Sequence, residues 1–305
     1  MKISKLIKIL LVLVIFLAVF VAIYFYQQVP HGQTPFLKAV DRSETMTLMQ
    51  GSQQVHLRKA NKSWEVSASQ GPWYTADPEK VKTLLAGLHD VRVEDVISEQ
   101  ADRGDYELSA ASGTRVTLFG PGQKTLADGF FGKQAPDFAH IYFRFPDRPQ
   151  VYLARNMIRG ELVGAALNEW RDRTLIDWPE AKVESVTIEG PGFTTSLARS
   201  SDTWTLDGKK IDPAPVYTLL GTLAHLKADD FVVPSKTTVY SYDMLRLAKI
   251  TARTADRSLE LCIGAEYAPT KRYPVAVAPD SGIAWLYESK VNSLLVKPSS
   301  FKSPS

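Results

Sequence analysis

Hydrophobic positions recur with the same spacing in two stretches of the chain, residues 77–88 and residues 212–223. Counted from the leading Asp, both stretches have Pro at +1, Val at +4, and Leu at +7, +8 and +11. This spacing places the apolar side chains along one face of a helix. We expect Asp77 and Asp212 to be the N-caps, each followed by Pro at the first helical position. Both stretches then reach an acidic pair and an apolar residue, so the sequence indicates a tandem repeat.

Short alternating stretches flank each predicted helix and favour β-strands. A Trp stands at the same place in Ser63–Val66 and in Thr203–Leu206. We expect both of these residues, Trp64 and Trp204, to lie in hydrophobic cores. Because short turns rather than crossover helices join the strands, the sheets should be mainly antiparallel. Each half of the chain is therefore predicted to be an α+β domain in which a sheet packs on a helix.

The predicted organisation has five parts. They are a signal-anchor transmembrane helix at 1–27, a tether at 28–41, a first α+β repeat at 42–169, a linker at 170–182 and a second α+β repeat at 183–302. At 305 residues the chain is long enough for two domains with separate cores.

The membrane prediction rests on Ile9–Tyr26, an uninterrupted run of 18 apolar or aromatic residues. As a helix this run is ~27 Å long, and residues 6–26 together are long enough to cross a lipid bilayer. The run is too long for an ordinary cleaved signal peptide. Lys2, Lys5 and Lys8 precede it, so the positive-inside rule puts the N-terminus in the cytoplasm. We expect a single-pass protein of the bacterial inner membrane, with most of the chain in the periplasm.

Charge and cysteine content exclude several classes of protein. The formal net charge of +3 comes entirely from the three N-terminal lysines, and the rest of the chain is neutral. A neutral chain lacks the basic face that a nucleic-acid-binding protein needs, so no nucleic acid is expected as a partner. The single cysteine, Cys262, excludes an internal disulfide and a cysteine-based metal cluster. Its strand-like surroundings predict a buried, unreactive thiol.

The paired motifs resemble those of the domain-of-unknown-function 4340 family over nearly everything after the anchor. The shared pattern consists of the strand Trp, the Asp-led leucine helix, the turns Tyr106–Leu108 and Tyr242–Met244, the strand ends Phe131–Gly132 and Ile263–Gly264, and the Arg-Asp-Arg linker at 171–173. The chain departs from the usual Tyr-Gly-Leu turn by having Glu107 and Asp243 in place of Gly. The resemblance implies a membrane-anchored envelope protein, associated in some members with gliding-type or other ABC transport systems. The family defines no catalytic residue.

A search for reactive chemistry yields no catalytic, cofactor-binding or metal-binding prediction. The five histidines show no metal-ligand spacing to one another. Neither Gly120–Gly122 nor Gly190–Gly192 is followed by the Gly-Lys-Ser/Thr of a phosphate-binding loop, and both are better explained as hairpin turns.

The two acidic pairs, Glu94–Asp95 and Asp229–Asp230, stand at the same offset in both repeats. Two carboxylates per repeat are candidates for binding a cation or a basic segment of a partner. The competing interpretation, which the sequence favours, is a solvated start of a strand with Val96 and Phe231 turned inward. Oxygen-ligand metal sites usually gather more acids in a Gly-containing loop.

The junction of the two halves carries a second candidate group, formed by Trp170, Arg171, Arg173 and Trp178. Their simplest role is to fix the orientation of the halves. If exposed, a Trp and Arg cluster is instead a candidate partner-binding patch, because these residues dominate binding energy at interfaces.

Two hypotheses of function follow. The first is a non-enzymatic, membrane-anchored accessory or scaffold subunit of a membrane complex, such as an ABC-transport system, bound to another membrane or envelope protein. The alternative is a periplasmic ligand-binding or hydrolytic module with its site in the cleft between the repeats, where duplicated domains often form one.

Overall fold

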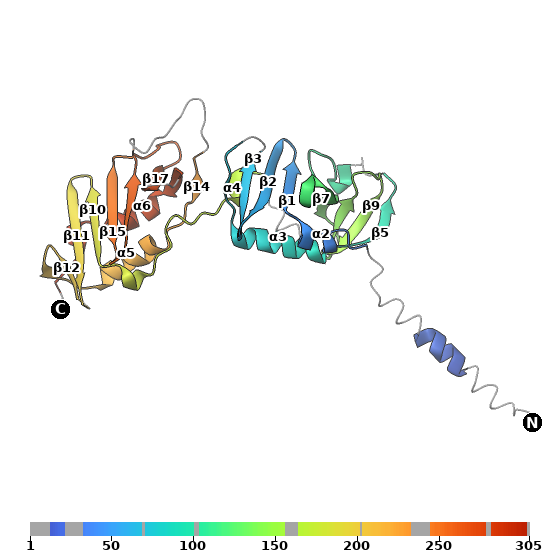
Figure 1. Cartoon of the computed structure of the whole chain (residues 1–305), viewed down its shortest axis with the longest axis horizontal. Helices are drawn as coiled ribbons and strands as arrows, with labels where there is room; N and C mark the ends of the chain where they lie inside the picture. Colours follow the sequence, from blue (N-terminus) through green and yellow to red (C-terminus); the bar gives the residue numbers. More distant parts are fainter. Residues whose placement is uncertain are drawn as a thin grey trace, which may run out of the picture. The chain divides into compact units, whose positions relative to one another are not determined.

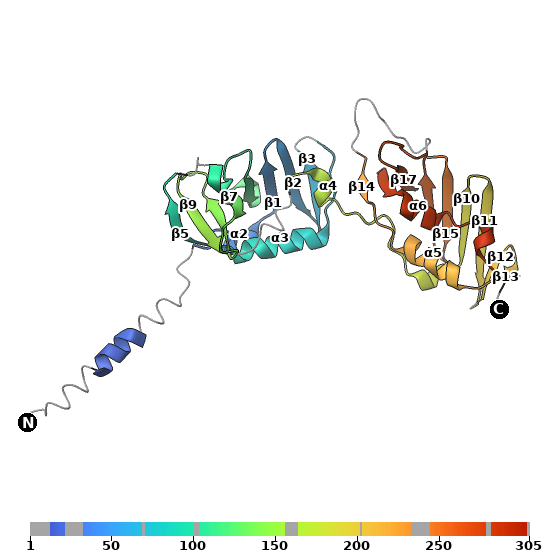
Figure 2. The ribbon, with the colours of Figure 1, turned by 180° about the vertical axis from the view of Figure 1, so that it is seen from behind.

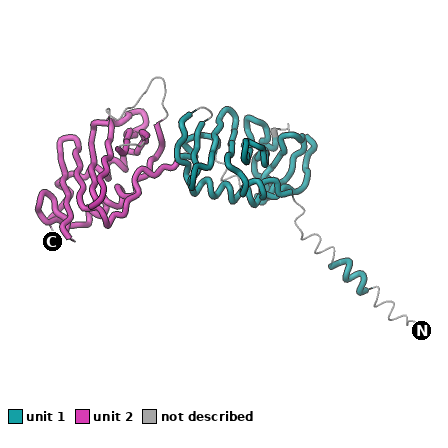
Figure 3. The backbone as a smooth tube through the Cα atoms, viewed as in Figure 1, with its two compact units in different colours: residues 1–171 teal, residues 172–305 magenta. Residues whose placement is uncertain are grey.

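The structure, a computed structural model, describes residues 13–21, 33–68, 71–100, 104–155, 164–201, 203–232, 245–278 and 282–303. The chain divides into two compact units, residues 1–171 and residues 172–305 (Figure 3). Each unit has its own hydrophobic core. We call the folded part of the first unit, from residue 33 onward, the first domain, and the second unit the second domain.

The first domain is built on one antiparallel sheet, in which the described residues form nine strands (Figure 1). The strands are β1 Thr45–Gln50, β2 Gln53–Ala60, β3 Ser63–Ala68, β4 Tyr74–Thr75, β5 Arg92–Ser98, β6 Thr114–Phe119, β7 Thr125–Gln134, β8 His140–Arg144 and β9 Val151–Arg155. Their order across the sheet is β4-β3-β2-β1-β6-β7-β8-β9-β5. Strand β5 follows the main helix in sequence but lies at the far edge, beside β9.

Helices cover one face of this sheet (Figures 1 and 2). They are α2 Leu37–Arg42, α3 Pro78–Asp90 and the short α4 Leu167–Trp170. The domain also has one-turn 3₁₀ helices at Gly104–Tyr106 and Pro121–Gln123. The predicted N-cap at Asp77 is confirmed, because its carboxylate accepts hydrogen bonds from the amides of Glu79 and Lys80. The apolar stripe of α3 is buried against the sheet, as its spacing predicted.

Part of the predicted tether is folded, which corrects the expectation for residues 33–41. Phe36 is fully buried in the first core, where its ring contacts Phe131 and Phe143. Ala39 of α2 is buried beside it. A short helix between polar residues looks like a linker in the sequence, because the aromatic residues that bury Phe36 lie about a hundred residues away.

The second domain repeats the same sheet, again with nine strands among the described residues. The strands are β10 Ser185–Gly190, β11 Phe193–Ser200, β12 Thr203–Leu206, β13 Lys209–Lys210, β14 Asp230–Phe231, β15 Ala248–Arg253, β16 Ser258–Ile263, β17 Arg272–Ala278 and β18 Ala284–Tyr287. The order β13-β12-β11-β10-β15-β16-β17-β18-β14 matches that of the first sheet position by position. The prediction of two antiparallel, sheet-rich domains is confirmed.

The helices of the second domain are α5 Ala214–Ala224 and α6 Glu288–Leu294, with one-turn 3₁₀ helices at Glu180–Lys182 and Pro298–Ser300. The predicted N-cap at Asp212 is wrong by one residue, since the N-cap of α5 is Pro213. Helix α5 begins at Ala214, two residues after the Asp, whereas α3 begins one residue after Asp77. The carboxylate of Asp212 still accepts a hydrogen bond from the amide of Ala214, at 3.0 Å.

The two strand tryptophans occupy the same register position in their sheets. Trp64 pairs with Lys59, and Trp204 pairs with Arg199. Trp204 is buried in the second core, as predicted. Trp64 is half-buried and packs against the first core, with the Lys59 ammonium 6.0 Å from the ring centre.

A second, smaller apolar cluster lies on each sheet, formed by side chains that alternate with those of the main core. In the first domain Phe130 of β7 packs with Leu108 and Val151. In the second domain Cys262 of β16 packs with Leu245 and Ala276. Cys262 is therefore buried, as the sequence indicated.

The predicted membrane anchor, residues 6–26, lies mostly outside the described residues. Residues 13–21 are helical. Within the part of the chain that the structure describes, no helix combines the length and apolar character needed to span a bilayer.

Candidate functional site

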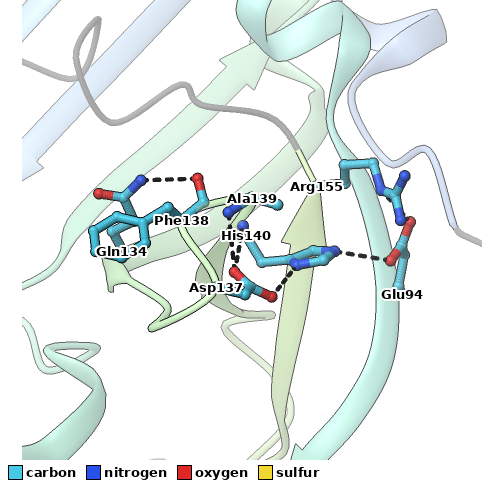
Figure 4. Close-up of polar contacts among 7 residues, drawn as sticks. All are labelled: Glu94, Gln134, Asp137, Phe138, Ala139, His140 and Arg155. Carbon is cyan, nitrogen blue, oxygen red and sulfur yellow. Dashed lines mark hydrogen bonds and ion pairs between the residues drawn. The ribbon is translucent and has the colours of Figure 1, made fainter.

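The acidic pair of the first domain lies on the edge strand β5. Glu94 is half-buried, and its carboxylate lies 3.0 Å from Nε of Arg155, at the end of β9. The other oxygen lies 3.2 Å from Nε2 of His140, at the start of β8 (Figure 4). Asp95 is exposed. Glu94 thus fastens the edge strand to the two strands next to it.

His140 lies between two carboxylates. Its Nδ1 is 2.6 Å from Oδ2 of Asp137, on the turn before β8, while its Nε2 faces Glu94 (Figure 4). The ring therefore lies within hydrogen-bonding distance of a carboxylate through each of its two nitrogens. The hydrogen bond from His140 holds the pKa of the Asp137 carboxyl below its usual range.

The turn between β7 and β8 is held by the same Asp137. Its Oδ1 accepts hydrogen bonds from the amides of Ala139 and His140, both at 3.0 Å. The side-chain amide of Gln134 donates to the carbonyl oxygen of Phe138 at 3.0 Å (Figure 4). Phe138 itself has a φ of 58°, in the left-handed region, and its side chain is 72% exposed.

The second domain fastens its edge strand in a related way. Asp230 on β14 pairs with Arg272 at the start of β17, at 3.2 Å. Asp229 accepts hydrogen bonds from the amide of Tyr287, at 2.8 Å, and from Lys290 of α6, at 2.6 Å. In the strand register Arg272 pairs with Tyr287 as His140 pairs with Arg155. A basic side chain therefore takes the same sheet position in both domains and meets the acidic pair.

The expectation that Val96 and Phe231 both turn inward is right for Phe231 and wrong for Val96. Phe231 is 6% exposed and joins the second core, whereas Val96 is 47% exposed. The register between β5 and β9 shifts on both sides of Val96. Each shift inserts an extra residue into β5, and such bulges break the alternation of inward and outward side chains.

The junction residues of the first unit are buried in it. Trp170 is 2% exposed, belongs to the first core and donates from Nε1 to the carbonyl oxygen of Gly164 at 3.1 Å. Arg171 is also buried, with its guanidinium 3.8 Å from the centre of the Tyr74 ring. Both side chains are therefore in contact with their own domain.

The junction residues of the second domain likewise contact their own domain. Arg173 donates to the carbonyl oxygen of Asp229 at 3.1 Å. Trp178 packs against the second core, and the guanidinium of Arg257 lies 5.0 Å from its ring centre. Among the predicted site residues, the structure thus brings Arg173 and Asp229 into contact.

The second domain also has a polar hollow of about 600 Å³. Its lining residues are Ala181, Lys182, Glu184, Arg199, Ser201, Thr254, Ala255 and Asp256. Thr254 donates to Asp256 at 2.7 Å, and this hydrogen bond lowers the pKa of the Asp256 carboxyl. Arg199 donates to the carbonyl oxygens of Ala181 and Ser201. The polar groups of the hollow are largely engaged with each other.

Sequence reasoning did not single out Asp137, His140 or Arg155 as partners of Glu94. Asp137 and His140 are three residues apart before a strand, a spacing typical of a side-chain-capped turn. No local pattern connects either residue with Glu94, because their contact depends on the order of the strands. Among the described residues, no group of three or more His, Cys, Asp or Glu side chains could hold a metal ion.

Comparison with known proteins gives one match. The family model of the domain of unknown function DUF4340 matches residues 51–244. No curated protein and no solved structure matches the chain.

Proposed function

The chain belongs to the DUF4340 family, and we propose that it is a non-enzymatic, membrane-anchored accessory or scaffold subunit of a membrane complex in the cell envelope. The partner to be tested first is an ABC-transport system. In this proposal the N-terminal helix holds the protein in a bacterial inner membrane, and the two domains bind another envelope protein in the periplasm.

One observation carries the non-enzymatic part of the proposal. Three of the four acids at the repeated positions, Glu94, Asp229 and Asp230, are engaged by basic side chains of their own domains. A general acid or base needs a carboxylate that can reach a substrate. These carboxylates instead hold edge strands in place, which supports domains that act through their surfaces.

The membrane part rests on the sequence. The apolar run Ile9–Tyr26 is long enough to span a bilayer, and three lysines precede it. The neutral charge of the remaining chain does not favour a nucleic acid as the partner.

The experiment is a mild-detergent purification of the full-length protein from its native membrane, with mass spectrometry of the proteins that accompany it. Two variants are purified in parallel. One lacks residues 1–27, and the other carries an unrelated single-pass anchor in their place. A stoichiometric membrane protein that accompanies the full-length chain supports the proposal.

The two variants then locate the contact. A partner retained by the anchor-swapped variant is bound by the domains, whereas a partner lost from it is bound by the native anchor. Recovery of the full-length protein alone and monomeric would refute the scaffold role. Labelling of a Tyr217→Cys variant with a membrane-impermeant thiol reagent in intact spheroplasts tests the location, because Tyr217 is half exposed on α5.

A further inference from the structure

The edge of the first domain is tied closely to the proposed anchor, and the inference below rests on the proposed function. Gln33 and Val93 of β5 exchange two backbone hydrogen bonds, of 2.7 and 2.8 Å. The apolar run ends at Tyr26. Because a chain spans at most ~3.5 Å per residue, the seven residue steps from Tyr26 to Gln33 reach at most ~25 Å. Strand β5 therefore stays within that distance of the end of the anchor.

Two apolar side chains are turned outward on this strand. Val96 is 47% exposed and Ile97 is 41% exposed. The register shifts in β5 are the cause, since they break the alternation that would bury one of each neighbouring pair. The corresponding residue in the second domain, Phe231, is buried. The outward apolar pair is thus a feature of the domain nearest to the anchor.

Phe138 adds an exposed aromatic ring on the turn between β7 and β8, two strands from β5 in the sheet. Its left-handed backbone is a conformation that costs free energy for a residue with a Cβ, and such outliers persist where the surroundings enforce them. Here the carboxylate of Asp137 and the side chain of Gln134 enforce it. The contact of His140 with Glu94 ties this turn to the first half of β5, the strand that carries the outward pair further along.

Two of the acids near these side chains are engaged within the domain. The carboxylates of Glu94 and Asp137 meet the two basic side chains Arg155 and His140. Pairing lowers the cost of bringing the acids close to a lipid surface, where an isolated anion would be unfavourable. The side chain of Arg155 is 63% exposed, which suits contact with anionic headgroups.

We propose that Phe138, Val96 and Ile97 form a membrane-contact patch, through which the first domain rests on the outer face of the bilayer that holds the anchor. A single exposed apolar residue needs no such explanation. The patch combines an enforced aromatic side chain, an outward aliphatic pair, acids that are engaged by Arg155 and His140, and a tether too short to let the edge move far from the lipid. Exposed apolar and aromatic side chains of this kind bind at the boundary between the lipid headgroups and the acyl chains.

The test places nitroxide labels on the full-length protein in vesicles of phosphatidylethanolamine and phosphatidylglycerol. Cysteines are introduced by Phe138→Cys and Ile97→Cys, with Leu17→Cys as the anchor control and Tyr217→Cys as the control for an exposed residue of the second domain. The native protein is the blank, since its Cys262 is buried. The readout is collision of the label with oxygen, which partitions into lipid, relative to a water-soluble nickel complex.

The expected ratio of oxygen to nickel collisions at residues 138 and 97 is at least threefold higher than at residue 217. Adding Phe138→Asp should return the label at residue 97 to water, whereas adding Tyr217→Asp should not. Labels at 138 and 97 that behave like the label at 217, while the label at 17 lies in lipid, would overturn the patch and leave the anchor intact. A label at 17 that lies in water would refute the anchor and the patch together. Labels at residues 138 and 97 that are protected from the nickel complex in native membranes but not in vesicles would assign the surface to a protein partner and reject lipid contact.

Discussion

Gly132, near the end of β7, leaves no room for a side chain. A Cβ at this position would overlap the backbone carbonyl oxygen of Tyr106 and would lie 3.0 Å from Cδ2 of Leu108. A carbonyl oxygen in the backbone cannot rotate away as a side chain can. Gly132→Ala must therefore push the turn at Tyr106 away from the sheet and disturb the small cluster around Leu108.

The expected loss in the free energy of unfolding follows from two opposing effects. Overpacking a closely packed site costs about 3 kcal/mol when the obstacle is rigid. Replacing Gly by Ala returns about 0.5–1 kcal/mol, because the unfolded chain loses freedom. The net loss is about 2 kcal/mol, which in a domain of this size lowers the melting temperature by about 8 °C.

The repeat supplies an internal comparison. Gly264 directly follows β16, and Gly132 lies near the end of β7, but a Cβ at Gly264 would meet the side chains of Leu245 and Pro274, both at 2.8 Å. Because the Leu245 side chain can shift but the Pro274 ring cannot, we expect a loss in the free energy of unfolding of about 1 kcal/mol, smaller than at Gly132. Gly71→Ala is the control, since a Cβ there meets atoms only at ordinary contact distances of 3.7 Å and more.

The assay is scanning calorimetry of the full-length protein in detergent, alongside the temperature at which Cys262 becomes reactive. Buried Cys262 reports unfolding of the second domain. Gly132→Ala should lower the first domain's transition and leave the Cys262 transition in place. If the first domain of this variant melts at the same temperature as that of Gly71→Ala, or if the Cys262 transition shifts instead, the steric argument is refuted.

Three further predictions use the same two domains. Gly221→Ala should stabilise the second domain by about 1 kcal/mol in urea unfolding, because Gly221 lies exposed inside α5 and the first repeat already has Ala86 there. The lowered pKa of Asp137 means that its contribution to stability is present above the unfolded carboxyl pKa of about 3.9 and is lost as pH falls through the lower folded value. Asp137→Asn should therefore lower the urea midpoint at pH 6–7, and a difference from the native protein that persists at pH 2 would contradict this linkage. Buried Cys262 should react with a thiol reagent at least tenfold more slowly in the native protein than in urea, and equal rates would show that it is accessible.

The repeated helix and the sheet-rich character of both domains could be predicted because their signals are local. The apolar spacing from Asp77 to Leu88 specifies a helix, its capping residue and its buried face, and all three are present in α3. The same spacing from Asp212 predicts α5, with a start displaced by one residue. Alternating strands joined by short turns predict antiparallel pairing, which the register confirms.

The contacts of Glu94 and the outward position of Val96 could not be predicted, because both depend on distant residues. Glu94 meets His140 only because β5 pairs with β9, which in turn pairs with β8. Val96 and Phe231 stand at equivalent sequence positions, but the bulges on both sides of Val96 turn it outward, whereas Phe231 is buried. Glu107 has a φ of 53°, which is the conformation that Gly adopts most easily and which explains the family's usual Gly at this turn. Asp243, its counterpart, lies outside the described residues.

The order of the strands also sets the order in which each domain can be completed. Strand β5 is made before β6 to β9 but finds its pairing partner only in β9, the last of them. In the second domain the pairing partner of β14 is likewise the last strand, β18. Closing such long loops slows folding, because their entropy is lost before the contacts form. Each domain must therefore remain unfinished during synthesis until its final strand is available, and a chain cut short before residue 151 or residue 284 should leave an unpaired edge that is prone to aggregation.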